Sequence, residues 1–178
     1  MNIRFSLIAL LCAFLTLIQS PNYAFASDPS SIDALPTQFD IDSAIFIDDS
    51  QTYRKYLQTL ELAHNQGNPT AECLIAYTAL LGYQGKIDNG KSRQIVAKYP
   101  DNRVCQHVKA IHLINSFHGG MGGPGALKAA NDILSGLATN GDHNGDSSLF
   151  YGSLLHHSSF GVKRVAEGTF WIEKSAKI

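Results

Sequence analysis

The sequence predicts an all-α fold, in the form of a short α-solenoid of about three antiparallel helical hairpins preceded by one helix. Helix-length segments alternate with short breaks rich in Gly, Asn and Asp, and no strand-like alternation of period two persists. The breaks also recur, because Gly82, Gly120 and Ser158 each end a similar run and stand 38 residues apart. Arrays of helical hairpins have periods of this size, since each pair leaves an apolar face that the next pair buries.

The first 26 residues have the pattern of a cleaved secretory signal peptide. Arg4 supplies a positive charge, an apolar run of 14 residues extends from Phe5 to Ile18, and Ala24-Phe25-Ala26 forms a small-x-small cleavage site before Ser27. Fourteen helical residues cover only about 21 Å, which is too short for a hydrocarbon core about 30 Å thick. We therefore expect a periplasmic or secreted protein with no stable membrane insertion after cleavage.

Residues 27–48 are expected to form an acidic leader, and residues 49–178 the repeat domain. Six aspartates and no basic residue lie between Ser27 and Asp49, without a sustained period. The first helix is predicted from Ser50, an N-cap candidate, to the glycine stop at Gly67. Six further helices are predicted at Pro69–Leu81, Gly90–Lys98, Arg103–Phe117, Gly125–Ala138, Asp146–His157 and Val165–Lys177.

The composition excludes some partners but does not identify one. Lys and Arg number 14 against 15 Asp and Glu, so the chain has no basic field for a phosphate backbone and no nucleic-acid partner is expected. Three cysteines without Cys-x-x-Cys spacing are too few for a disulfide scaffold or a zinc ribbon. No cofactor is predicted.

Parts of the chain resemble the Sel-one-like repeats, a subclass of tetratricopeptide-like helical hairpins. Within AHNQGNPTAECLIAYTALLG, the residues at the family's offsets are Gly67, Ala71, Ile75, Ala76 and Gly82, although Ala79 replaces the usual aromatic residue. Within YGSLLHHSSFGVKRVAEGTFWIEKSA they are Gly152, Gly161, Val162, Trp171 and Ala176, with one extra residue before Gly161. The middle unit matches least, keeping Leu113, Phe117 and Gly120. The resemblance extends roughly from Ala63 to Ala176, which is most of the mature chain.

The resemblance implies a binding module that contacts an unidentified protein through the first helix of each hairpin. Candidate surface residues on those helices are Tyr77, His112, Phe150, His156 and His157. The chain ends without a polar capping helix, so self-association or a partner would cover an apolar end face. Two alternatives stay open: a small periplasmic hydrolase that uses His156 or His157 with Ser158 or Ser159, and a periplasmic neutraliser of a toxin or enzyme. We favour binding over catalysis.

Three other patterns suggest ligands only weakly. The run GGMGGPGALK lacks the Gly-Lys-Ser/Thr order of a P-loop and is better interpreted as a hairpin turn. Asp142, Asn144 and Asp146 have the spacing of an EF-hand loop, but Ser147 and Ser153 replace its turn glycine and bidentate glutamate. We expect Asp146 to cap the helix that follows. His107 and His112 lie about 140° apart around a helix, so no metal site is predicted there.

Cys73 and Cys105 are expected to pair if the protein is exported, but their predicted positions conflict with this expectation. The 38-residue offset places Cys105 about 9 Å lower than Cys73 along neighbouring helices, which gives a Cα separation of roughly 12–13 Å. A disulfide requires less than about 7 Å. The bridge can therefore form only if the irregular segment YPDNRVC shifts Cys105 toward the first hairpin, and otherwise both cysteines are small core residues.

Overall fold

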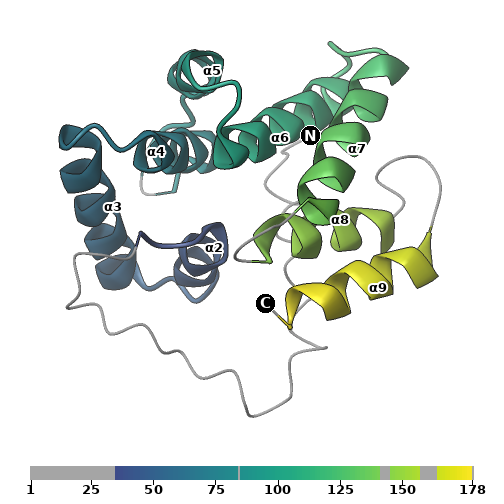
Figure 1. Cartoon of the computed structure of the whole chain (residues 1–178). Coiled ribbons are helices and arrows are strands. Elements are labelled where there is room, and N and C mark those ends of the chain that lie inside the picture. The colour runs from purple at the N-terminus through teal and green to yellow at the C-terminus, as the bar shows by residue number, and fades with distance from the viewer. Residues whose placement is uncertain (1–34, 84, 141–144, 157–163, 178) are drawn as a thin grey trace.

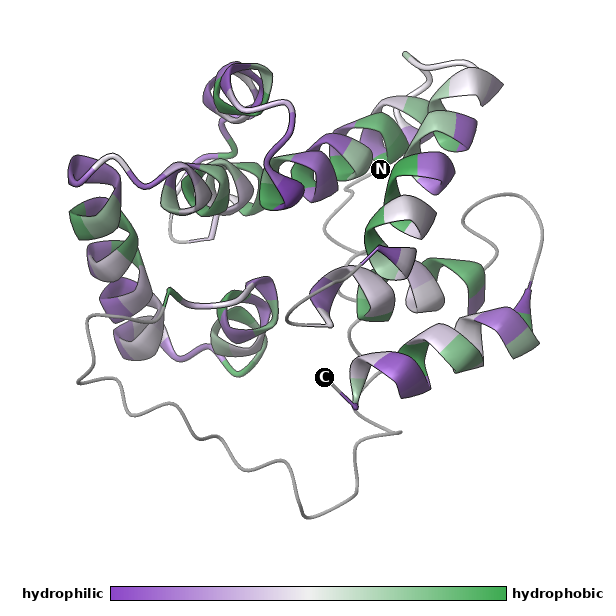
Figure 2. Cartoon of the chain, in the orientation of Figure 1, coloured by the Kyte–Doolittle hydropathy of each residue, from purple (hydrophilic) through white to green (hydrophobic). Residues whose placement is uncertain are grey.

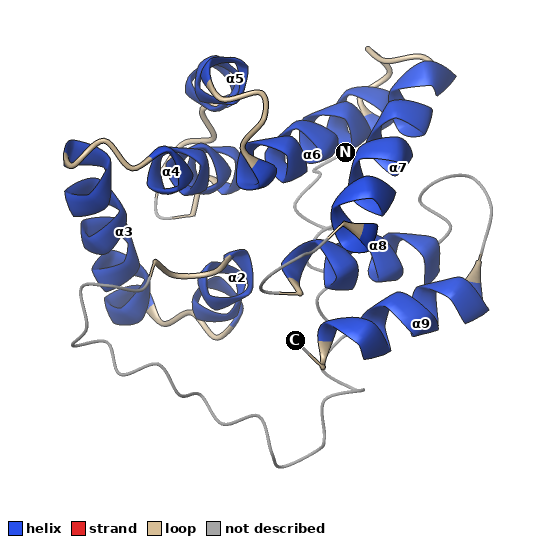
Figure 3. Cartoon of the chain, in the orientation of Figure 1, coloured by secondary structure: helices blue, strands red, loops and turns tan. Residues whose placement is uncertain are grey.

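The described part of the protein is entirely helical. The computed structural model describes residues 35–83, 85–140, 145–156 and 164–177, and within these ranges it contains eight helices and no strand (Figure 3). These helices are α2 (Gln38–Phe46), α3 (Ser50–Asn65), α4 (Pro69–Leu81), α5 (Asn89–Lys98), α6 (Arg103–His118), α7 (Pro124–Thr139), α8 (Asp146–His156) and α9 (Val165–Ser175). The all-α prediction is confirmed, and the seven predicted helices occur within two residues of their expected bounds. The signal segment and His157 lie outside the described residues.

The helix α2 was not predicted, and it moves the start of the helical body into the acidic leader. Thr37 and Asp40 form a capping box, in which each side chain accepts a hydrogen bond from the other residue's backbone N–H. Ile41 and Ala44 are buried one turn apart in the same core as residues of α3, α4, α5 and α6. Helical structure therefore begins inside the segment that was expected to be an acidic leader, and α2 gave little periodic signal because only two of its nine residues are buried apolar ones.

Helices that follow one another in the chain pack together. The most extensive packing joins α8 to α9, α6 to α7 and α4 to α5. α4 also packs beside α6, and α7 packs against α8. Figure 1 shows the result as a curve with α3 at one end, α9 at the other and α2 on its inner side.

Two hydrophobic cores meet at α6. One core is formed by the helices from α2 through α6 and includes Tyr53, Leu60 and Tyr77. The other is formed by the helices from α6 through α9 and includes Leu134, Tyr151 and Leu155. Phe150 packs against both cores. In Figure 2, hydrophobic residues run along α4, α6 and α7, while α5 is mainly hydrophilic. Among the described helices, none is long and apolar enough to cross a membrane.

Asparagine residues cap the starts of α4 and α6. Asn68 accepts hydrogen bonds from Thr70 and Ala71 at the start of α4, and Asn102 does the same for Val104 and Cys105 at the start of α6. These caps are 34 residues apart, while the glycines that cap the ends of the two helices, Gly82 and Gly119, are 37 apart, because α4 has 13 residues and α6 has 16. The starts of α4 and α6 are therefore closer in sequence than the 38-residue interval between the glycine breaks predicted.

Candidate binding site

A group of hydrogen bonds between distant helices lies where α2 meets α4 and α8. We call this the inner face, made of Tyr77 on α4 with Asp146, Ser147 and Phe150 on α8. The inner face holds α2 by hydrogen bonds to its backbone and to one of its side chains. Each of these contacts has a separate chemical role.

Tyr77 holds an acidic side chain of α2. Its hydroxyl donates to the carboxylate of Asp42, with distances of 2.6 and 2.7 Å to the two oxygens. Loss of hydration raises the pKa of Asp42 to about 7, although the Tyr77 hydrogen bond opposes this. Burial and the Asp42 charge together raise the pKa of Tyr77 well above its ordinary value, so the phenol remains a hydrogen-bond donor.

Asp146 holds the N-terminus of α2. Its carboxylate accepts hydrogen bonds from the backbone N–H groups of Gln38 and Phe39, at 3.0 and 3.3 Å. A negative charge at this end complements the helix dipole and satisfies amides that have no partner within the helix. The sequence placed Asp146 in a loop as a cap for its own helix, whereas this carboxylate reaches a helix more than 100 residues away in the chain. The other two residues of the EF-hand-like pattern, Asp142 and Asn144, lie outside the described residues.

His107 joins α6 to the inner face. Its Nδ1 lies 3.0 Å from the hydroxyl of Ser147, and its ring packs on Phe150 with 4.9 Å between the ring centroids. Burial lowers the pKa of His107 to about 3, so the ring is neutral at ordinary pH. The pair is a buried contact between two helices, because Ser147 is only 7% exposed and leaves no room for a substrate.

A second histidine makes a similar contact on the other side of α6. The Nε2 of His112 lies 2.8 Å from the hydroxyl of Ser92 on α5, and Ser92 is fully buried. Burial lowers the pKa of His112 as well. His107 and His112 therefore diverge as their spacing predicted, and each links α6 to a different helix. The described residues include no group of three or more His, Cys, Asp or Glu side chains that could hold a metal ion.

Part of the predicted binding surface is wrong. Tyr77 and His112 are 3% and 9% exposed, because α2 lies over Tyr77 and α5 supplies the partner of His112. Phe150 is half-buried beside His107. His156 is partly exposed, and its Nε2 lies 3.0 Å from the Thr169 hydroxyl on α9. The candidate residues on α4 and α6 are thus more buried than the resemblance implied, and α2, which covers Tyr77, was not predicted.

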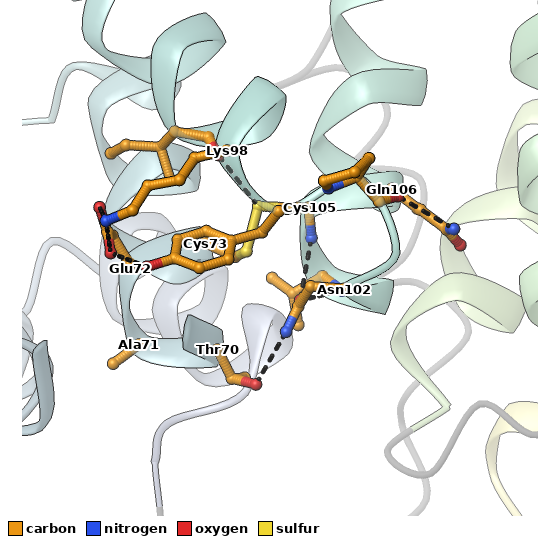
Figure 4. The surroundings of a disulfide bond; sticks show 12 residues. Thr70, Ala71, Glu72, Cys73, Lys98, Asn102, Cys105 and Gln106 are labelled. Atoms are coloured by element: carbon orange, nitrogen blue, oxygen red, sulfur yellow. Dashed lines mark hydrogen bonds and ion pairs between the residues drawn. A yellow bond between two sulfur atoms is a disulfide. The ribbon is translucent and has the colours of Figure 1, made fainter. Parts of the chain in front are cut away.

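The structure contains the Cys73–Cys105 disulfide, and the predicted separation of the two residues is wrong. Their Cα atoms are 5.0 Å apart. With the asparagine caps aligned, Cys105 corresponds to Ala71, only two residues from Cys73 along the helix. Figure 4 shows how the neighbouring side chains fix this register: Asn102 donates to the Thr70 hydroxyl at 3.1 Å, and Lys98 pairs with Glu72 at 3.0 Å.

A groove of about 540 Å³ lies between α6 and α7, outside the inner face. Arg103 and Lys109 line it from α6, and Asp132 lines it from α7. Arg103 already donates to the backbone carbonyl groups of Leu137 and Asn140 at the C-terminal end of α7. The charged groups of the groove are therefore already engaged in part, because Asp132 also pairs with Lys128.

Replacing Asp42 by asparagine tests the polar bond at the inner face. Because the pKa is raised on folding, protonated Asp42 contributes its full share to the free energy of unfolding below about pH 4. This contribution is lost as the pH rises to about 7. Asparagine keeps an acceptor for Tyr77 and never ionises. We expect the free energy of unfolding of Asp42→Asn, relative to the wild type, to rise by up to about 1.4 kcal/mol per pH unit between pH 4 and 7.

Urea denaturation at pH 4, 5.5, 7 and 8 measures this difference. The low pKa of His107 makes both proteins less stable in acid and cancels in the comparison. Asp101→Asn, an exposed replacement of the same kind, is the matched control. A difference that does not change with pH would show that Asp42 ionises freely at the inner face.

Comparison with protein-family models, with curated proteins and with solved structures found no match to this chain.

Proposed function

We propose that this protein is an exported protein-binding module, a short α-solenoid of Sel-one-like repeats. The observation that carries the proposal is the packing of α2 against the inner face, where an acidic helix is held by its N-terminal amides, by Asp42 and by buried aliphatic residues. This is the way in which a groove recognises an amphipathic helix. A surface that holds one helix by these contacts has the chemistry to bind another.

Several features support the repeat assignment. Sequential hairpins pack in chain order, Gly67, Gly82 and Gly120 adopt positive φ at the helix ends, and two helices carry equivalent asparagine caps. Small residues bring the helices of the last hairpin together, as Gly152 and Gly168 face one another across α8 and α9. The disulfide supports the proposed export, because such bonds persist in oxidising compartments.

The buried histidine–serine pairs favour binding over hydrolysis. In both pairs the serine hydroxyl is enclosed between helices, so neither can approach a substrate carbonyl. His156 is the one predicted catalytic histidine among the described residues, and it contacts Thr169.

Affinity capture from the periplasmic fraction of the producing cells tests the function. We expect the full mature chain to retain one protein in stoichiometric amount. Hydrolysis of cell-wall fragments that is lost in His156→Ala, in the absence of such a partner, would contradict the proposal and favour an enzyme.

Export makes a separate prediction about processing. The protein recovered from a secreting host is expected to begin at Ser27, because signal peptidase recognises Ala24-Phe25-Ala26 after the apolar run. Intact-mass spectrometry decides this directly. A mass that includes Met1 would contradict export.

A further inference from the structure

The contacts of α2 define a pattern that another helix could match. The helix begins at Gln38, where Asp146 accepts two N–H groups, and its fifth residue is Asp42, which accepts from Tyr77. Its fourth and seventh residues, Ile41 and Ala44, are 0% and 3% exposed. The inner face therefore fits a helix whose N-terminal amides are free, with an aliphatic residue at the fourth position, an acidic residue at the fifth and a small residue at the seventh.

The fit of α2 to this face is incomplete. The side chain of Gln38 is 6% exposed, yet within the described part of the chain its Nε2 donates no hydrogen bond. A buried donor without an acceptor costs free energy that an apolar side chain of similar size would not cost. A helix with leucine at this position would therefore bind the inner face more tightly than α2 does.

The connection of α2 to the body is also distinct from the hairpin turns. α2 joins α3 through Ile47, Asp48 and Asp49, and Asp48 is the one described non-glycine residue with positive φ, at 55°. The Tyr83 hydroxyl donates to Asp48 and holds this turn. A left-handed backbone conformation at an aspartate costs a small amount of conformational free energy. The chain connection between α2 and the helices that follow is this short turn alone.

We propose that α2 is an intramolecular ligand of the inner face, and that the partner is another protein that presents an acidic amphipathic helix and replaces α2. This inference rests on the proposed binding function and specifies its site and the class of its ligand. The partner helix needs an acid at its fifth residue for Tyr77 and an aliphatic residue at its fourth. It also needs an apolar residue at its first position, where α2 has Gln38.

The test uses the full mature chain and a fluorescent peptide of residues 36–47 that carries Gln38→Leu. In the Thr37→Ala chain, α2 loses its capping box while the inner face is unchanged, so α2 competes less well. We expect this chain to bind the peptide about fivefold more tightly than the wild type, measured by fluorescence anisotropy. Asp40→Ala removes the same box and provides a second variant if Thr37→Ala unfolds.

A matched peptide tests the acid. Asp42→Ala in the peptide removes the acceptor for Tyr77 and is expected to weaken binding about tenfold. Equal binding of the two peptides, or no binding to a folded Thr37→Ala chain, would overturn the inference. Dimerisation of the chain by exchange of α2, seen in sedimentation, would also overturn it by making a second copy the occupant. If the peptide fails while affinity capture still retains a stoichiometric partner, the binding function stands and this site does not.

Discussion

Replacing Cys73 and Cys105 together by alanine is expected to lower the free energy of unfolding by about 3–4 kcal/mol. The bond joins α4 to α6 across 32 residues of sequence, so its loss frees a long loop in the unfolded chain. Both sulfur atoms lie in the first core with no exposure. The expected loss is large beside the 5–15 kcal/mol stability of typical domains.

Urea denaturation of the oxidised wild type and the double variant measures this effect. Wild-type protein in excess reductant is the matched control and should unfold near the midpoint of the variant. Thiol titration of the oxidised, denatured mature chain should find neither cysteine free. Two free thiols, or equal midpoints for the oxidised and reduced protein, would contradict the disulfide.

The second large effect is expected where α8 crosses α9. A Cβ atom on Gly152 would lie 2.7 Å from the carbonyl oxygen of Gly168, and a Cβ atom on Gly168 would lie equally close to that of Gly152. The obstructing atoms are backbone, so the helices must move apart. We expect Gly152→Ala and Gly168→Ala each to cost about 3 kcal/mol.

Gly136→Ala provides the matched control for this crossing. Gly136 lies within α7 with nothing within 4 Å of an added Cβ, so alanine should raise stability by up to about 1 kcal/mol through helix propensity. Denaturation midpoints of the three variants make the comparison. Similar midpoints for Gly152→Ala and Gly136→Ala would show that α8 and α9 do not meet as closely as the structure shows.

The helices could be predicted from sequence because their boundaries carry local chemical signals. Asn68 and Pro69 begin α4, and Gly82 ends it in the left-handed region. α2 has only one boundary signal, the capping box of Thr37 and Asp40, and it has too few buried apolar residues to show a helical period. Searching for capping boxes as well as for periodicity would have found it.

The binding site could be predicted only in part, because it depends on contacts between distant residues. Tyr77 was selected as a surface residue from its place on a first helix, but its exposure is determined by a segment 35 residues earlier. The hydrogen bonds that Asp146 accepts from the backbone of α2 span more than 100 residues and leave no local pattern in the sequence. The disulfide separation was wrong for a related reason, since the glycine breaks mark helix ends while the asparagine caps mark helix starts.

The central claim, that the inner face contacts a partner protein, is tested most directly by site-specific photo-crosslinking. Benzoylphenylalanine in place of Phe150, a half-buried aromatic residue of the inner face, is compared with the same group at Met121, which is 79% exposed beyond α6. In the secreting cell, the account predicts a crosslink to a second protein from position 150 and none from position 121. A crosslink from position 121 alone, with position 150 joined only to its own chain, would contradict it.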